Sequence, residues 1–142
     1  SLTEPTKKMS KSSTNEKSKI SLNDDPKAAM KKIMSATTDS EGVIRFDMVK
    51  QPGISNLMQI EALINNRELQ DVISDFAGQT MYGDLKKKVA DSVYHFLSDF
   101  QEKVAQISDE EVEKILEDGE KYANQVSREK LNLVQKAVGL RK

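Results

Sequence analysis

The residues with the clearest chemical potential form the pentapeptide Lys8-Met9-Ser10-Lys11-Ser12, close to the start of the chain. Two lysines three positions apart, set among small hydroxyl residues in a loop, can close together on a triphosphate. Their ammonium groups would then neutralise the negative charge that develops on departing pyrophosphate. The competing interpretation is a solvated tail rich in lysine and serine, with no chemical role. The amino-acid composition favours the tail, whereas the order of all five residues favours the phosphate clamp.

The segment around this pentapeptide is polar and has no helical apolar periodicity, so it cannot bury enough surface to fold alone. The first 34 residues hold eight lysines and four acidic residues. We therefore expect residues 1–24 to be an extended, flexible arm that carries the loop. Residues 25–142 are expected to form a helical domain.

The fold class predicted for residues 25–142 is all-α, a bundle of about five helices. Asp25 before Pro26 is a helix start, because the carboxylate can cap amide groups and proline lacks the N–H that would go unpaired. Ser108 and Glu111 have the spacing of a capping box. Gly139 follows the last predicted helical residue, where glycine commonly caps a helix C-terminus. Together with the apolar periodicity, these signals predict helices over residues 25–34, 52–65, 69–77, 83–107 and 108–138.

Composition excludes several classes of function. The chain has no cysteine, so it has neither a disulfide framework nor a thiolate metal site. It has no apolar run of about 18 residues, so we expect no membrane span. Seven acidic residues in 108–120 and six basic residues in 121–142 suit the dipole of one long helix, and this charge contrast says little about function. No metal-ligand motif is predicted.

Beyond the pentapeptide, which is the signature loop of class I aminoacyl-tRNA synthetases, the chain resembles the bacterial tryptophanyl-tRNA synthetase family over essentially its whole length. The collinear blocks that carry the resemblance are D-D-P-K at 24–27, T-D-S-x-G at 38–42, P-G-I-S-N-L at 52–57 and Y-G-x-x-K at 82–86. One departure is Ser13-Thr14, where the family usually has an acidic residue followed by a turn residue such as proline.

The resemblance implies activation of tryptophan with ATP and transfer of the tryptophanyl group to tRNA(Trp). Lys8 and Lys11 would be the catalytic phosphate-binding residues, Lys11 most directly. Met9, Ser10 and Ser12 would complete the ATP-binding loop, although Met9 could equally pack against the adenine or against the core. ATP would enter with Mg²⁺ as a substrate complex, and no permanently bound cofactor is implied.

The resemblance also implies that the helical domain contacts the anticodon loop, although no anticodon-reading residue can be named. Basic residues that could contact phosphate are grouped on two predicted helices. They are Lys86, Lys87 and Lys88 on one, and Arg128, Lys130 and Lys136 on the other. A solvated helical face is the simpler interpretation of both groups.

The family's nucleotide-binding half, with its histidine motif and tryptophan pocket, has no counterpart here. The single histidine, His95, lies on a predicted helix away from its apolar stripe, and we interpret it as a surface or boundary residue. We therefore expect a C-terminal fragment that is inactive alone, from a cytoplasmic, homodimeric parent enzyme with no membrane partner. Two alternatives stay open: a free-standing helical interaction module, and a piece of another class I synthetase, the tyrosyl enzyme.

Overall fold

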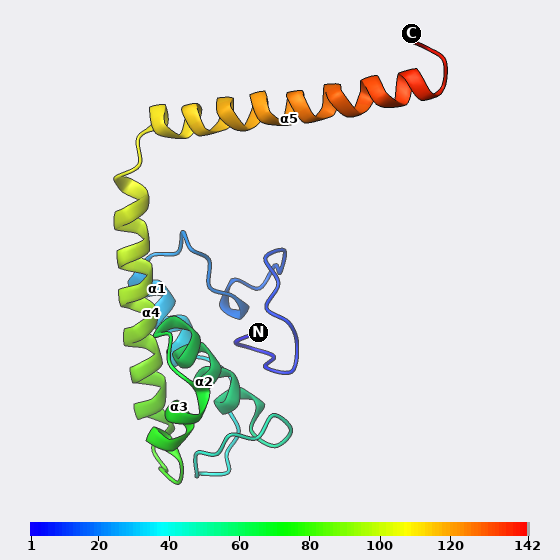
Figure 1. Ribbon diagram of the computed structural model, residues 1–142. Coiled ribbons are helices and arrows are strands. Elements are labelled where there is room, and N and C mark those ends of the chain that lie inside the picture. Colours follow the sequence, from blue (N-terminus) through cyan, green and yellow to red (C-terminus); the bar gives the residue numbers. More distant parts are fainter. Residues whose placement is uncertain (142) are drawn as a thin grey trace. The chain divides into compact units, whose positions relative to one another are not determined.

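A computed structural model describes residues 1–141, and within them it contains helices and no strand, which confirms the all-α prediction. The elements in chain order are the 3₁₀ turn η1 (Glu16–Ser18) and the helices α1 (Pro26–Met34), α2 (Pro52–Ile64), α3 (Leu69–Phe76), α4 (Tyr82–Ala105) and α5 (Asp109–Ala137) (Figure 1). The chain divides into two compact units, Ser1–Glu102 and a second that begins at Lys103. The expected functional boundary after residue 24 falls inside the first unit and stays a prediction.

The helix ends lie where the capping signals predict them. The Asp25 carboxylate accepts a hydrogen bond from the Ala28 N–H at 2.8 Å, and Pro26 is the first residue of α1. At the start of α5, the Ser108 side chain accepts from the Glu111 N–H while Glu111 accepts from the Ser108 N–H. Gly139 follows α5 with a φ of 76°. Local side-chain chemistry therefore determines these boundaries.

The core of the first unit is small and aliphatic, and every helix from α1 to α4 contributes to it. Its largest contributors are the inward faces of α2 and α4, which lie in one cluster with Ile33 of α1 and Val72 of α3. Those faces consist of Ile54, Leu57, Met58 and Ala62 on α2, and Leu85, Val89, Val93 and Leu97 on α4. These positions recur at steps of three or four, as helix burial requires.

Residues 1–24 differ from the extended arm that the sequence predicts. They fold into turns around η1, and Leu2 is only 1% exposed, in the same cluster as the helices. The Leu2 N–H donates to the Ser18 carbonyl at 3.0 Å, and the Leu2 carbonyl accepts from the Thr37 N–H at 2.9 Å. Although the segment is too polar to fold by itself, this apolar residue and these backbone bonds fix it on the helices.

The apolar stripes of the last two helices are not fully buried. On α4 the stripe residues Leu85, Val89, Val93 and Leu97 are buried, whereas Phe96, Val104 and the following Ile107 are 41%, 50% and 53% exposed. In α5 no side chain is buried, and the stripe residues Ile115 and Tyr122 are about 70% exposed, at 71% and 72%. Periodicity thus predicts these helices correctly but not the burial of their apolar faces. Among the helices of residues 1–141, none has the length and apolar character needed to cross a membrane.

Candidate functional site

The Lys8–Ser12 pentapeptide forms a short exposed turn. The Ser13 N–H donates to the Ser10 carbonyl at 3.2 Å, and the hydroxyl oxygens of Ser10 and Ser12 lie 3.1 Å apart. Lys8 and Lys11 are exposed, and neither forms an ion pair with a carboxylate of residues 1–141. The turn therefore presents two ammonium groups to an anion from solvent.

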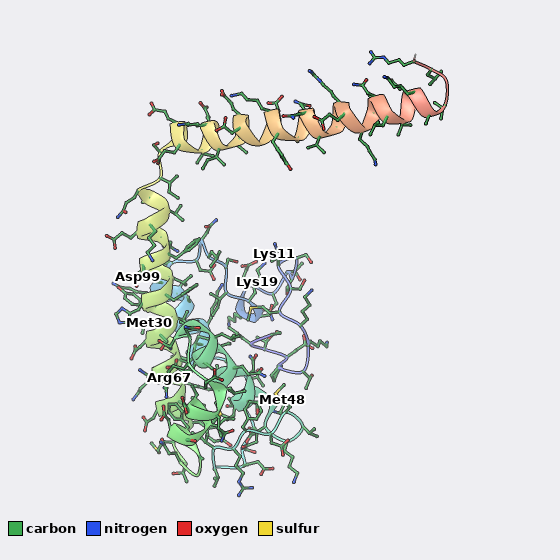
Figure 2. The ribbon with its side chains drawn as sticks, viewed as in Figure 1. Lys11, Lys19, Met30, Met48, Arg67 and Asp99 are labelled. Atoms are coloured by element: carbon green, nitrogen blue, oxygen red, sulfur yellow. The ribbon has the colours of Figure 1, made fainter. Side chains whose placement is uncertain are left out.

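Lys19 binds the main chain of this turn. Its Nζ atom donates to the carbonyl oxygens of Lys11 and Ser13, both at 3.0 Å, and pairs with the Glu16 carboxylate at 3.0 Å. Figure 2 shows Lys11 and Lys19 beside each other in the N-terminal loop. Sequence reasoning missed Lys19, because it is one of five lysines in a polar stretch and the turn that faces it exists only in the folded chain.

Met9 anchors the other side of the turn. It is partly buried and packs against the hydrophobic core, as Ile20 does, so of the two positions weighed for Met9 the structure shows the core. Beside it lies an open cleft of about 420 Å³, whose lining includes Met9, Lys11, Lys19 and Ile20. A smaller apolar groove of about 180 Å³ continues from Met9 and Ile20 to α2 and to Phe96 of α4. Lys11 and Lys19 therefore lie at the border of an apolar surface.

A buried polar network lies elsewhere in the first unit, centred on Gln51. Its Nε2 atom donates to Asp39 Oδ1 at 2.9 Å and to the Tyr82 hydroxyl oxygen at 2.8 Å. The Tyr82 hydroxyl donates to the same Asp39 oxygen at 2.5 Å. On the far side, Gln51 Oε1 accepts from the Arg45 N–H at 2.8 Å. These contacts join the T-D-S-x-G segment, the start of α2 and the start of α4.

The network shifts the proton affinities of its members. Burial alone would raise the pKa of the Asp39 carboxyl, but hydrogen bonds from Tyr82, the Glu41 N–H and Gln51 outweigh burial and hold that pKa below its usual value. Burial, followed by the bond to Asp39, raises the pKa of the Tyr82 phenol. Both groups are therefore kept in their ordinary states at neutral pH, and the network is a structural lock.

Gly53 is tied to the same region by close packing. A Cβ atom added to Gly53 would lie 2.2 Å from the Thr37 carbonyl oxygen, so only glycine fits at the start of α2. Thr37 immediately precedes the T-D-S-x-G segment. The same Cβ atom would lie 3.1 Å from Thr38 Cα, so the P-G-I-S-N-L and T-D-S-x-G blocks are in contact and Gly53 makes this close approach possible.

The basic residues considered for phosphate contact occupy different environments. Lys86 is partly buried and donates to the Ala36 carbonyl at 2.8 Å, and desolvation lowers the pKa of its ammonium group. It therefore supports the end of α1, contrary to the surface position expected for it. Lys87 and Lys88 are exposed.

The remaining candidates lie on exposed surfaces. On α5, Arg128, Lys130 and Lys136 are exposed. His95 is exposed on α4, as expected for a surface residue. No group of three or more histidine, aspartate or glutamate side chains within residues 1–141 could hold a metal ion.

Comparison with known proteins places these features in a family. The family described as tRNA synthetases class I (W and Y) matches residues 1–98. A tryptophan–tRNA ligase of Caldanaerobacter subterraneus is 46% identical over 99% of the chain, and one of Bacillus anthracis is 43% identical over 99%. The tryptophanyl-tRNA synthetase structure from Mycoplasma pneumoniae has a TM-score of 0.80 and 35% identity, again over 99% of the chain. The chain spans 42% and 43% of the two ligases and 45% of the Mycoplasma protein.

Proposed function

Because the chain belongs to the class I tRNA synthetases of the tryptophan and tyrosine group, we propose that it works as part of a tryptophan–tRNA ligase. In this role it supplies a phosphate-binding loop and a helical region for tRNA. The curated relatives are named tryptophan–tRNA ligase, which favours tryptophan over tyrosine as the amino acid. Since the chain spans less than half of their length, the tryptophan pocket and the rest of the nucleotide site are assigned to the part of the ligase outside it.

The observation that carries the proposal is the pair of exposed ammonium groups on a turn that is anchored from two sides. In the first reaction step, the tryptophan carboxylate attacks the α-phosphorus of ATP, and the bond to the bridging oxygen of pyrophosphate breaks. Negative charge then accumulates on the departing β- and γ-phosphates. Lys8 and Lys11 can neutralise this charge, because each offers donors that no carboxylate of residues 1–141 occupies.

Lys11 is assigned the more direct role of the two. It lines the open cleft beside the loop, and its own carbonyl is held by Lys19. Ser10 and Ser12 stabilise the turn through the hydrogen bond between their hydroxyls. Met9 holds the turn against the helices by packing on the core. Mg²⁺ would arrive with ATP as part of the substrate.

In the second step the tryptophanyl group moves to tRNA, and we assign tRNA contact to the helices. Lys87, Lys88, Arg128 and Lys130 are exposed and available for phosphate contact. Binding through such residues is electrostatic, so it should weaken steeply as salt increases. The residues that read the anticodon are not assigned. A cytoplasmic homodimer is the proposed state of the whole ligase.

The test is tryptophan-dependent exchange of pyrophosphate into ATP by the full-length ligase that contains this chain. We expect exchange with tryptophan, none with tyrosine as the matched control, and none by the 142-residue chain alone. Exchange that depends on tyrosine would move the assignment to the sister enzyme. Exchange by the isolated chain would contradict the division of the active site proposed above.

A further inference from the structure

The Lys19 ammonium is held by oxygens of its own segment. It donates two hydrogen bonds at 3.0 Å, to the Lys11 and Ser13 carbonyls, and it forms an ion pair with the Glu16 carboxylate at 3.0 Å. The side chain is only 13% exposed, whereas lysines are rarely buried without a partner. Lys19 is therefore engaged within the chain, whereas Lys8 and Lys11 form no ion pair with a carboxylate of residues 1–141.

The main chain on either side of Lys19 is fixed by its neighbours. Ile20, the next residue, packs against the hydrophobic core. Ser18, the preceding one, is buried, and its hydroxyl donates to the Asn15 carbonyl at 2.6 Å. The backbone around Lys19 is thus fixed to the helices. The Lys19 ammonium can therefore restrict the movement of the Lys11 and Ser13 carbonyls that it binds.

Besides Lys19, the turn is held by Met9, which packs on the core, and by the Ser13 hydroxyl oxygen, which accepts from the Ser18 hydroxyl at 2.9 Å and from the Asn15 N–H at 3.2 Å. Its own hydrogen bonds within residues 10–13 are one backbone bond at 3.2 Å and one pair of hydroxyls at 3.1 Å, all on exposed or partly exposed residues. The bond from Lys19 to the Lys11 carbonyl fixes the peptide group that follows Lys11. The bond to Ser13 fixes the turn two residues later. Charge-assisted bonds of this kind are about twice as strong as neutral ones.

We propose that Lys19 is a positioning residue that acts through Lys11. It binds no substrate, but it holds the main chain on the C-terminal side of Lys11, so that the Lys11 ammonium is presented in one orientation before ATP arrives. Glu16 keeps the Lys19 ammonium beside the two carbonyls through their ion pair. The effect of Lys19 on the rate of tryptophan activation rests on the proposed function. Its effect on the conformation of the Lys8–Ser12 turn does not.

The order of the loop is tested by trypsin cleavage after Lys8 and Lys11 in the 142-residue chain. Lys19→Met keeps an unbranched side chain but removes all three donors, and we expect cleavage about tenfold faster than in the wild type. Lys19→Arg, which retains donors, should restore most of the protection. Lys17→Met removes an exposed lysine of η1, two residues before Lys19, and should leave cleavage after Lys8 and Lys11 unchanged. Equal cleavage rates in Lys19→Met and the wild type would overturn the proposal.

Kinetics of the full-length ligase test whether Lys19 acts through Lys11. Lys19→Met should lower kcat for tryptophan activation about tenfold and change the KM for ATP less than about threefold, with partial rescue by Lys19→Arg. In a Lys11→Ala background, Lys19→Met should cause no further loss, because its effect passes through the missing side chain. Fully additive losses would overturn the proposal. If Lys11→Ala alone kept full activity, the proposed function of the loop would fail, and the trypsin comparison would still decide whether Lys19 holds the turn.

Discussion

Two regions of the first unit carry the family resemblance, and they differ in almost every physical respect. The Lys8–Ser12 turn is exposed, and its two lysines lack carboxylate partners among residues 1–141. The region around Gln51 is its opposite, since this buried side chain bonds to Asp39 and Tyr82. The lysines of the first region are open to solvent, whereas the polar groups of the second bond to one another, with Asp39 Oδ2 as a buried oxygen that has no hydrogen-bond partner among residues 1–141.

The difference teaches that a family motif can exist for chemistry or for packing, and that burial tells the two apart. Asp39, Tyr82 and Gly53 are the kinds of residue that invite a functional interpretation. In the fold they link the connector before α2 to the starts of α2 and α4. Changes in the second region should therefore alter stability, and changes in the first should alter reaction rate.

The largest stability effect is expected from Gly53→Ala. The added methyl group would collide with the Thr37 carbonyl oxygen, which is backbone and cannot rotate away. We expect a loss of roughly 3 kcal/mol in the free energy of unfolding, measured by urea denaturation.

The matched control for that prediction is Gly83→Ala in α4. A Cβ atom at Gly83 would meet nothing within 4 Å, so the helix should gain roughly 0.5 kcal/mol from the alanine. If both variants had equal stability, the contact between α2 and the Thr37 backbone would not constrain the sequence as inferred.

A smaller effect is expected from Tyr82→Phe, which removes the hydrogen bond to the ionised Asp39 carboxylate and the one accepted from Gln51 Nε2. The expected loss is about 1.5 kcal/mol in urea denaturation. Tyr94→Phe lies on the same helix, and among residues 1–141 the Tyr94 hydroxyl has no hydrogen bond, so this control should stay within about 0.5 kcal/mol of the wild type. A Tyr82→Phe variant as stable as this control would show that the network does not lock the fold.

The pH dependence of stability gives the smallest and most gradual effect. The pKa of Asp39 is lowered in the fold from its usual 3.8, so its stabilising contribution is complete above that pH and is lost as the pH falls through the folded value. Asp24, which pairs with Lys32 at 2.6 Å, behaves alike: burial opposes its ionisation, but the hydrogen bonds from Lys32 and the Ser21 N–H and the charges of Lys32 and Lys19 together outweigh burial and lower its pKa. The urea midpoint should therefore decrease from about pH 5 to about pH 3.

Asp39→Asn tests the source of this decrease. The variant should show a shallower decrease than the wild type, with the remainder contributed by Asp24 and by Asp47, whose pKa is lowered by hydrogen bonds from the Lys50 and Val49 N–H groups. Asp91→Asn, on the exposed surface of α4, should keep the full decrease. A slope in Asp39→Asn as steep as in the wild type would contradict the role of the network in acid sensitivity.

Sequence alone predicted the helices well, because helix starts depend on neighbours in the chain. The Asp25 and Ser108 caps and the prolines at the first positions of α1 and α2 are local signals, and the structure confirms each. The apolar periodicity of α4 also predicts the buried positions Leu85, Val89, Val93 and Leu97.

What sequence could not predict depends on partners distant along the chain. The acceptor of Lys86 is the carbonyl of Ala36, fifty residues away, so this lysine was placed at the surface. Gln51 precedes a helix start, and nothing in the neighbouring sequence indicates that its side chain is buried and bonded to Asp39 and Tyr82. The exposed stripe of α5 shows the same limit, since periodicity identifies an apolar face but not what covers it.

The contrast between the two regions is tested most directly by the rate of tryptophanyl-adenylate formation in the full-length ligase carrying Lys11→Ala. At saturating ATP and tryptophan we expect the rate to decrease about 10²–10³-fold, while the affinity for ATP changes far less. A rate equal to that of the wild type would contradict the assignment of Lys11 to the departing pyrophosphate.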